Sequence, residues 1–100
     1  MLNITFADNQ LSLIETDQAG STKLPVAVIK SARRKLAVVR SLTDVNQLRT
    51  WKSLHYEKLK GNYEGKRSIR LNDQYRLIFE INKETVPHTI IVLEIKDYHS

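Results

Sequence analysis

The chain has no cysteine, which excludes disulfide bonds, thiolate metal sites and cysteine nucleophiles. No apolar run approaches the roughly 20 residues that a membrane-spanning helix needs. The first ten residues, MLNITFADNQ, lack the basic, apolar and small-residue order of a signal peptide. HExxH motifs, clustered metal ligands and a second paired carboxylate are absent as well, so we expect no metal or other cofactor. These absences predict one small cytoplasmic domain over residues 1–100, with no membrane partner.

Acidic residues are scarce in the middle of the chain. Residues 23–76 carry 14 Lys and Arg but only four Asp and Glu, a balance of +10. The two flanking segments together carry two lysines and seven acids, a balance of −5. This separation of charge favours a surface that faces a polyanion, with nucleic acid as the leading candidate. The alternative is a solvated, helix-rich segment that is basic but binds no ligand.

Hydrophobic periodicity predicts a strand and then helices in the first half. Leu2, Ile4 and Phe6 alternate with polar residues, as in a short strand. Residues 8–16 are expected to form one or two helical turns, and residues 20–22 to end them. The main helix is expected to start at Pro25 and to have one apolar and one basic face. Its apolar face comprises Val26, Ile29, Ala32, Leu36 and Val39, and its basic face Lys30, Arg34 and Lys35, with Arg33 and Arg40 near the boundary. The spacing of Asp44, Leu48 and Trp51 predicts a shorter second helix.

After Gly61 the apolar period changes from helical to two, as in strands. A three-residue turn at 72–74 joins two strands and pairs Leu71 with Tyr75. A connection at 83–87 leads to a last strand at 88–96. The element order predicts a compact α+β fold, with an N-terminal strand and helices packed on an antiparallel sheet that three C-terminal strands complete.

The predicted hairpin register places Arg70 opposite Arg76. Like charges directly across a strand pair destabilise it by up to about 1 kcal/mol. Two guanidinium forks also match the oxygens of a phosphate well. The pair therefore indicates an anion site, unless the side chains diverge into water or Glu80 and Glu94 neutralise them.

A basic loop lies just before this hairpin, in the segment LHYEKLKGNYEGKRS. Gly61 and Gly65 bracket it, but their spacing is not that of a phosphate-binding P-loop. Its basic residues are Lys58, Lys60, Lys66 and Arg67, and His55 and Tyr63 are interleaved with them. Basic residues among aromatic ones suit an RNA backbone with bases stacked nearby. The alternative is an exposed turn with ordinary lysines and a surface histidine.

The sequence closes on Asp97, Tyr98 and His99, followed by Ser100. An antiparallel last strand would bring its end close to Arg76 and the basic loop. Histidine titrates near neutral pH and is the usual general acid or base. Tyr98 offers a donor or a stacking plane, and Asp97 can orient either neighbour. The alternatives are a frayed terminal histidine, a packing aromatic and a turn or salt-bridge acid.

The segment LHYEKLKGNYEGKRSIRLNDQYRLIFEI and the closing DYH resemble the HigB branch of the RelE/ParE superfamily of bacterial toxins. The resemblance covers most of the chain and implies a compact RelE-like α+β domain. It further implies cleavage of mRNA in the ribosomal A site. The implied partner is a helix-turn-helix, HigA-like antitoxin that neutralises the toxin and represses the operon, so that operator DNA is contacted only through the antitoxin.

The resemblance also implies a mechanism, in which a ribose 2′-OH attacks the adjacent phosphate without a metal. His99 would act as acid or base, and Asp97 and Tyr98 would position the histidine and the nucleotide. Arg76, with Lys60 and Arg70, would stabilise the developing charge. The remaining implied site residues are His55 as a further catalytic residue and Lys58, Tyr63, Lys66 and Arg67 for substrate binding. The sequence departs from the family at two places. The segment HYEKLKG, which contains His55, is longer than the family's HPLKG. Lys66–Ser68 stands where an aromatic residue is common, so an aromatic stacking platform is missing or is supplied by Tyr63.

Two other functions remain open at this point. One is inhibition of DNA gyrase in the manner of ParE, which binds a protein and needs no acid or base. The other is RNA binding without catalysis. The grouping of DYH beside paired arginines favours the nuclease, because binding alone gives no reason for it.

Overall fold

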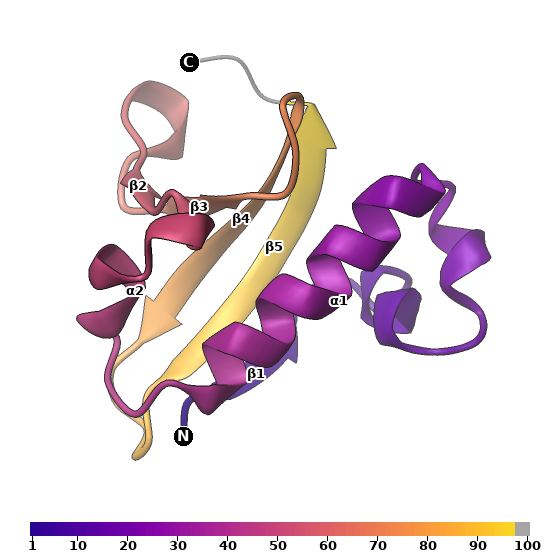
Figure 1. Ribbon diagram of the computed structural model, residues 1–100. Coiled ribbons are helices and arrows are strands. Elements are labelled where there is room, and N and C mark those ends of the chain that lie inside the picture. The colour runs from indigo at the N-terminus through magenta and orange to yellow at the C-terminus, as the bar shows by residue number, and fades with distance from the viewer. Residues whose placement is uncertain (98–100) are drawn as a thin grey trace.

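The structure is a computed structural model that describes residues 1–97 (Figure 1). Its strands are β1 (Asn3–Phe6), β2 (Glu57–Lys58), β3 (Arg67–Arg70), β4 (Tyr75–Asn82) and β5 (Thr89–Asp97). Its α-helices are α1 (Val26–Ser41) and α2 (Gln47–Thr50). Its 3-10 helices are η1 (Leu11–Glu15), η2 (Ala19–Thr22), η3 (Lys52–Leu54) and η4 (Gly61–Tyr63). Among the helices of residues 1–97, none is long and apolar enough to cross a membrane.

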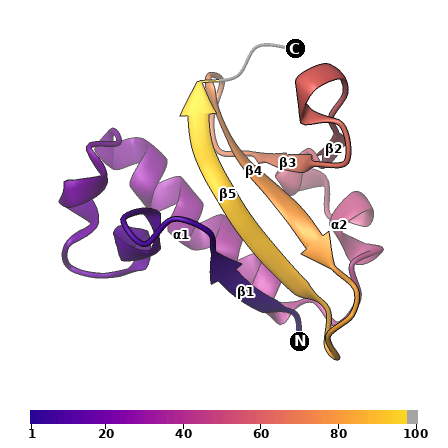
Figure 2. The same ribbon diagram turned by 180° about the vertical axis from the view of Figure 1, so that it is seen from behind.

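The strands form one sheet in the order β1-β5-β4-β3-β2, and α1 lies across one of its faces (Figures 1 and 2). The pairs from β2 to β5 are antiparallel, which confirms the predicted α+β fold. The N-terminal strand does not merely pack on this sheet but extends it, because β1 pairs in parallel with β5. The pairing begins where the Asn3 amide donates to the carbonyl of His88, 3.1 Å away. The sheet is therefore mixed rather than purely antiparallel.

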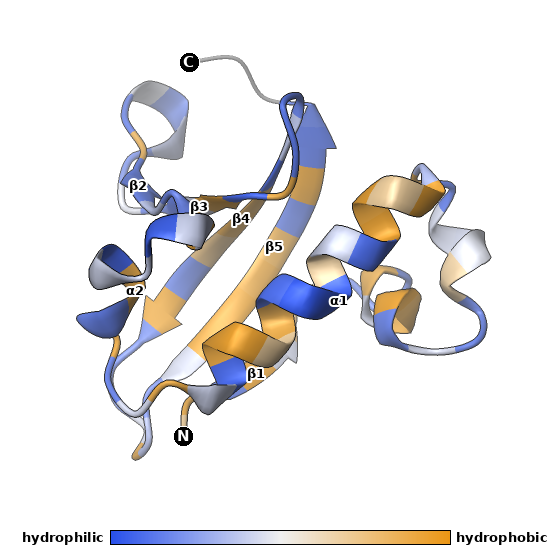
Figure 3. Ribbon diagram, in the orientation of Figure 1, coloured by the Kyte–Doolittle hydropathy of each residue, from blue (hydrophilic) through white to orange (hydrophobic). Residues whose placement is uncertain are grey.

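The core lies between α1 and the sheet. As predicted, Ile29, Ala32, Leu36 and Val39 of α1 are buried. They belong to the same core as Leu77 and Phe79 of β4 and Ile90 and Val92 of β5. Figure 3 shows the bands of alternating hydropathy along α1 and β5 that this packing requires. Val26 was predicted on the buried face but is 66% exposed, because it is the first residue of the helix.

Two arginines of α1 fasten the segment that precedes the helix. Arg33 donates from Nε to the carbonyl of Ile14 (2.7 Å) and from Nη2 to that of Thr16 (2.6 Å). The guanidinium of Arg40 forms a two-pronged pair with the carboxylate of Glu15, and this hydrogen bonding raises the pKa of Arg40. Part of the basic excess of the middle segment is therefore used inside the fold and faces no ligand.

Short elements depart from the sequence prediction. The predicted helix around residues 44–51 is only the four residues of α2, and Trp51 is 45% exposed because the backbone becomes extended there. Gly20, Ser21 and Thr22 do not simply end a helical segment but lie in the second 3-10 helix, η2. Strand β2 was not predicted, since two residues are too few for a periodic signal.

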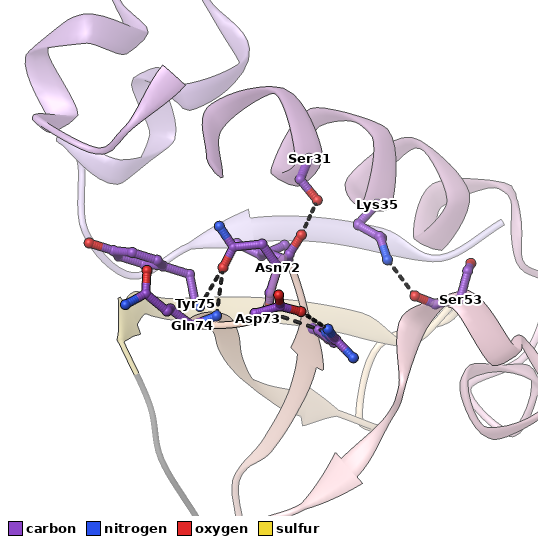
Figure 4. Close-up of polar contacts among 9 residues, drawn as sticks. Ser31, Lys35, Ser53, Asn72, Asp73, Gln74 and Tyr75 are labelled. Carbon is purple, nitrogen blue, oxygen red and sulfur yellow. Dashed lines mark hydrogen bonds and ion pairs between the residues drawn. The ribbon is translucent and has the colours of Figure 1, made fainter. Parts of the chain in front are cut away.

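The hairpin of β3 and β4 has the predicted register. Ile69 pairs with Leu77, Arg70 pairs with Arg76, and the Leu71 amide donates to the carbonyl of Tyr75 (2.9 Å). The turn is closed by the side chain of Asn72, whose Oδ1 accepts from the amides at 74 and 75 (Figure 4). Such a side-chain-closed turn is what asparagine favours at this position.

Replacing a buried residue of η1 tests how firmly this segment belongs to the core. Ile14 is fully buried, and we expect Ile14→Ala to lower the free energy of unfolding by about 2–5 kcal/mol, because it leaves a cavity. Val86 is 96% exposed, so Val86→Ala should change stability by less than about 0.5 kcal/mol. Urea unfolding of both variants measures the difference. Equal midpoints would show that η1 contributes little to the core.

Candidate functional site

Three cations stand in one row on the face of the sheet that points away from α1. Leu77 points into the core under α1, so its neighbour Arg76 points to the opposite face. Arg76 pairs with Arg70 of β3 on one side and with Lys96 of β5 on the other. The sequence argument found the first pair but not Lys96. The pairing of Lys96 with Arg76 could not be predicted from strand alternation alone, because the bulge between Ile78 and Phe79 shifts the β4–β5 pairing by one residue.

Arg76 is the best-anchored of these cations. Its side chain is only 15% exposed. Nε donates to Oγ of Ser68, 2.7 Å away, and Nη2 donates to the backbone carbonyl of His55. A carboxylate oxygen of Glu57 lies 3.6 Å from Nη2. This guanidinium therefore joins β4 to β3, to β2 and to the turn before β2.

Arg70 follows a different course, although its register position is the predicted one. Its Nε donates to the carbonyl of Asn72 (3.3 Å), and its Nη2 forms an ion pair with Asp73. The two arginines thus contact different carboxylates, Asp73 and Glu57. Of the two acids that the sequence suggested as neutralisers, Glu94 lies 3.9 Å from the ammonium of Lys96.

Lys96 reaches from β5 to the basic loop. Its ammonium donates to the hydroxyl of Tyr63 at 2.5 Å. Lys66 of the same loop has its ammonium 5.6 Å from the centre of the Tyr63 ring, within the range of a cation–π contact. Tyr63 is therefore held by one lysine of the loop and one of the sheet.

The basic loop is shaped by its two glycines. Gly61 has a φ of +65° and Gly65 a φ of +86°, a left-handed backbone that other residues adopt only with strain. A pocket of about 430 Å³ lies beside Gly65. It is lined by Lys58, Leu59, Lys60, Glu64, Gly65, Lys66 and Arg67. Four cations around one hollow make it a suitable place for a phosphate group.

Arg67 belongs to this pocket rather than to the row of cations. It alternates with Ser68 along β3 and therefore points to the other face. Its Nε donates to the hydroxyl of Tyr56 (2.8 Å) and its Nη1 to the carbonyl of Gly65 (3.2 Å). The predicted substrate-binding residues therefore fall into two groups. Lys58, Lys66 and Arg67 line the pocket, and Lys66 also contacts Tyr63. Arg70 lies on the face that carries Arg76.

The end of β5 lies beside Arg76, as the sequence predicted. Lys96 pairs with Arg76, and Asp97 pairs with Tyr75 at the start of β4. Asp97 is exposed and lies on the face opposite to Arg76. The other two residues of the closing motif, Tyr98 and His99, lie outside the described residues.

His55 is exposed and takes a left-handed backbone conformation, with a φ of +46°. Its backbone carbonyl is the group that meets Arg76. Lys60 is exposed at the start of η4. Within residues 1–97 no group of three or more His, Asp or Glu side chains is placed to hold a metal ion.

A second positive region lies on α1. Lys35 donates from its ammonium to the carbonyl of Ser53 (Figure 4). Burial lowers the pKa of Lys35, and the nearby charges of Arg34 and Arg70 lower it further. The charge of Arg70 on β3 is therefore close enough to Lys35 of α1 to act on its pKa.

Known proteins resemble this chain in sequence and in fold. A family described as the RelE-like toxin of the type II toxin–antitoxin system HigB matches residues 4–99. Toxin HigB-1 of Vibrio cholerae serotype O1 is 32% identical over 77 residues, which cover 77% of this chain and 81% of that protein. A chain of the YoeB–YefM complex from Staphylococcus aureus has a TM-score of 0.60 at 24% identity, covering 100% of this chain and 99% of that one. A chain of the toxin–antitoxin complex RelBE2 from Mycobacterium tuberculosis has a TM-score of 0.52 at 18% identity, covering 97% and 98%.

The contact between Ser68 and Arg76 can be tested by stability. Ser68 is fully buried, and Ser68→Ala removes the acceptor of the Arg76 Nε–H. We expect a loss of about 1.5–3 kcal/mol in the free energy of unfolding, because a guanidinium donor is left without its partner in a largely buried place. The control is Ser53→Ala, since Ser53 is exposed and only its backbone carbonyl meets Lys35. If both variants unfold at the same urea concentration, Ser68 does not hold Arg76.

Proposed function

This chain belongs to the HigB-like family of RelE-like toxins of type II toxin–antitoxin systems, and from that premise we propose that it is a ribosome-dependent mRNA endoribonuclease. The observation that carries the proposal is the pairing of Lys96 with Arg76, which brings the end of β5 to an anchored guanidinium and the basic loop. Cations for a phosphate thus stand next to the strand after which Tyr98 and His99 follow in the sequence. The substrate is mRNA in the ribosomal A site.

The reaction is attack of a ribose 2′-OH on the adjacent phosphate, with no metal. The 2′ proton goes to a base, the bond to the leaving 5′ oxygen breaks, and an acid protonates that oxygen. We assign His99 to the acid or base role and Asp97 and Tyr98 to its positioning. Arg76 is proposed to stabilise the charge that develops on the phosphate oxygens. Its two-pronged fork is already oriented by Ser68.

The other predicted residues take supporting roles in this proposal. Lys60 and Arg70 add positive charge near the reacting phosphate, and His55 is the second candidate for proton transfer. The flanking nucleotides are bound by Lys58, Tyr63, Lys66 and Arg67. Lys58, Lys60, Lys66 and Arg67 line the pocket of the basic loop, which supports a path for the RNA backbone across it.

The proposed partners are those of a toxin in such a system. They are the ribosome with its mRNA, and a helix-turn-helix antitoxin that silences the toxin and alone contacts operator DNA. Two of the structural relatives come from complexes, the YoeB–YefM complex and the toxin–antitoxin complex RelBE2, which supports an antitoxin partner for this chain. The place of action is the cytoplasm, where ribosomes translate.

Cleavage on purified ribosomes tests the function. Ribosomes carry mRNA with defined codons in the A site, and cleavage is followed for the wild type, for His99→Ala and without ribosomes. We expect cuts at the A-site codon that require the ribosome, and a rate about 10²–10⁴-fold lower for His99→Ala. His88→Ala is the matched control, because His88 directly precedes the first residue of β5 and His99 follows the last.

Intact mRNA in the presence of folded wild-type protein would contradict the nuclease. A supercoiling assay with DNA gyrase would then test the ParE-like alternative, and salt-dependent RNA binding would test a non-catalytic module.

A further inference from the structure

Tyr63 and Lys96 come from segments that are 33 residues apart in the sequence. The coil that contains η4 and Tyr63 lies on the side of the sheet away from α1, as the two opposite views show (Figures 1 and 2). Lys96 points to the same side, since it pairs with Arg76. Their hydrogen bond therefore spans from the basic loop to the last strand, across the face that carries the row of cations.

The Lys96 ammonium contacts the Tyr63 hydroxyl and not the face of the ring. The ammonium of Lys96 is 2.5 Å from the hydroxyl oxygen of Tyr63 and 5.1 Å from the ring centre. Both distances are met only if the ammonium lies beyond the oxygen and near the plane of the ring. Lys96 therefore fixes the direction of the Tyr63 side chain and covers neither face of the ring.

Hydrogen bonds within residues 59–66 give the coil its shape. The amides of Tyr63, Glu64 and Lys66 donate to the carbonyls of Lys60, Gly61 and Tyr63, all within the coil. At its base the Leu59 amide donates to the carbonyl of Lys66 (3.0 Å). These bonds hold the shape of the coil but do not fix its tip relative to β4 and β5. The bond from Lys96 to Tyr63 does.

We propose that Lys96 is a positioning residue that acts through the Tyr63 hydroxyl, holding the basic loop at a fixed distance from Arg76 so that both bind one RNA backbone. The inference rests on the proposed nuclease function and names a residue that supports it. Two like charges face each other where Lys96 pairs with Arg76, which costs stability unless each has a partner. For Lys96 that partner is Tyr63, with Glu94 at 3.9 Å.

A double-mutant cycle on the cleavage rate tests the proposal. Lys96→Met removes the donor and the charge, whereas Tyr63→Phe removes only the acceptor. Single-turnover cleavage on ribosomes should slow about tenfold for each variant and no further for the double variant, because both break the same bond. Lys96→Arg should restore the rate to within about threefold, since it keeps a donor. Lys83→Met, an exposed lysine in the β4–β5 connection, is the matched control and should cleave like the wild type.

The rate constant at saturating toxin separates positioning from folding. When folded toxin saturates the ribosomes, the single-turnover rate constant does not depend on the fraction of toxin that is folded, whereas a displaced loop lowers it. If Tyr63→Phe cleaves at the wild-type rate while Lys96→Met is slow, Lys96 acts by its own charge and the proposal is wrong. Additive effects in the double variant would overturn it as well.

Hydrogen exchange of the free protein gives a reading that needs no activity. Both single variants should speed exchange of the amides at 63, 64 and 66 by about the same factor, and Lys83→Met should not. If the wild type cleaves no mRNA but this exchange pattern is found, the nuclease fails while the link between loop and sheet stands. If the wild type cleaves and exchange is unchanged in both variants, the link fails while the nuclease stands.

Discussion

The guanidinium of Arg76 is the constraint on which the site depends. A charged group that is only 15% exposed must find a partner for its donors, or the fold loses more than the side chain contributes. Its partners include the hydroxyl of Ser68 on β3, the carbonyl of His55 and the carboxylate of Glu57 on β2. These partners are in place because the chain turns at His55, whose backbone is left-handed, and then pairs β2 with β3. The basic loop between β2 and β3 therefore lies near the end of β5.

Arginine and lysine divide the positive charge between structure and surface. A planar guanidinium binds two acceptors at once, which suits it to hold segments together. Arg33 and Arg40 fasten the segment before α1, and Arg67 and Arg70 fasten turns of the sheet. Lysines such as Lys58 and Lys60 remain exposed. The charge counted along the sequence is therefore larger than the charge that faces a polyanion. Composition does not distinguish an arginine that is bound within the fold from a cation on the surface.

Local signals made the hairpin predictable, and distant contacts made the rest hard to predict. A three-residue turn closed by Asn72 sets the pairing of Arg70 with Arg76, and both lie within one short segment. The parallel pairing of β1 with β5 joins the two ends of the chain, and no periodicity in either strand encodes it. The position of Lys96 depends on the bulge between Ile78 and Phe79, which no local sequence pattern marks. The closing residues Tyr98 and His99 are predicted from the chemistry of their side chains.

Along β4 and β5, residues of the core under α1 alternate with residues of the candidate site. Leu77 and Phe79 point to α1 and are buried in the core, whereas Arg76 and, on β5, Lys96 point to the loop. Because neighbouring residues of a strand face opposite ways, a substitution at Lys96 disturbs the core under α1 little, and that core can vary without moving the cations. Ser68 lies on the side of Arg76 but is fully buried, and it also orients the guanidinium of Arg76. At that residue the fold and the site share one hydrogen bond, so changes there alter both together.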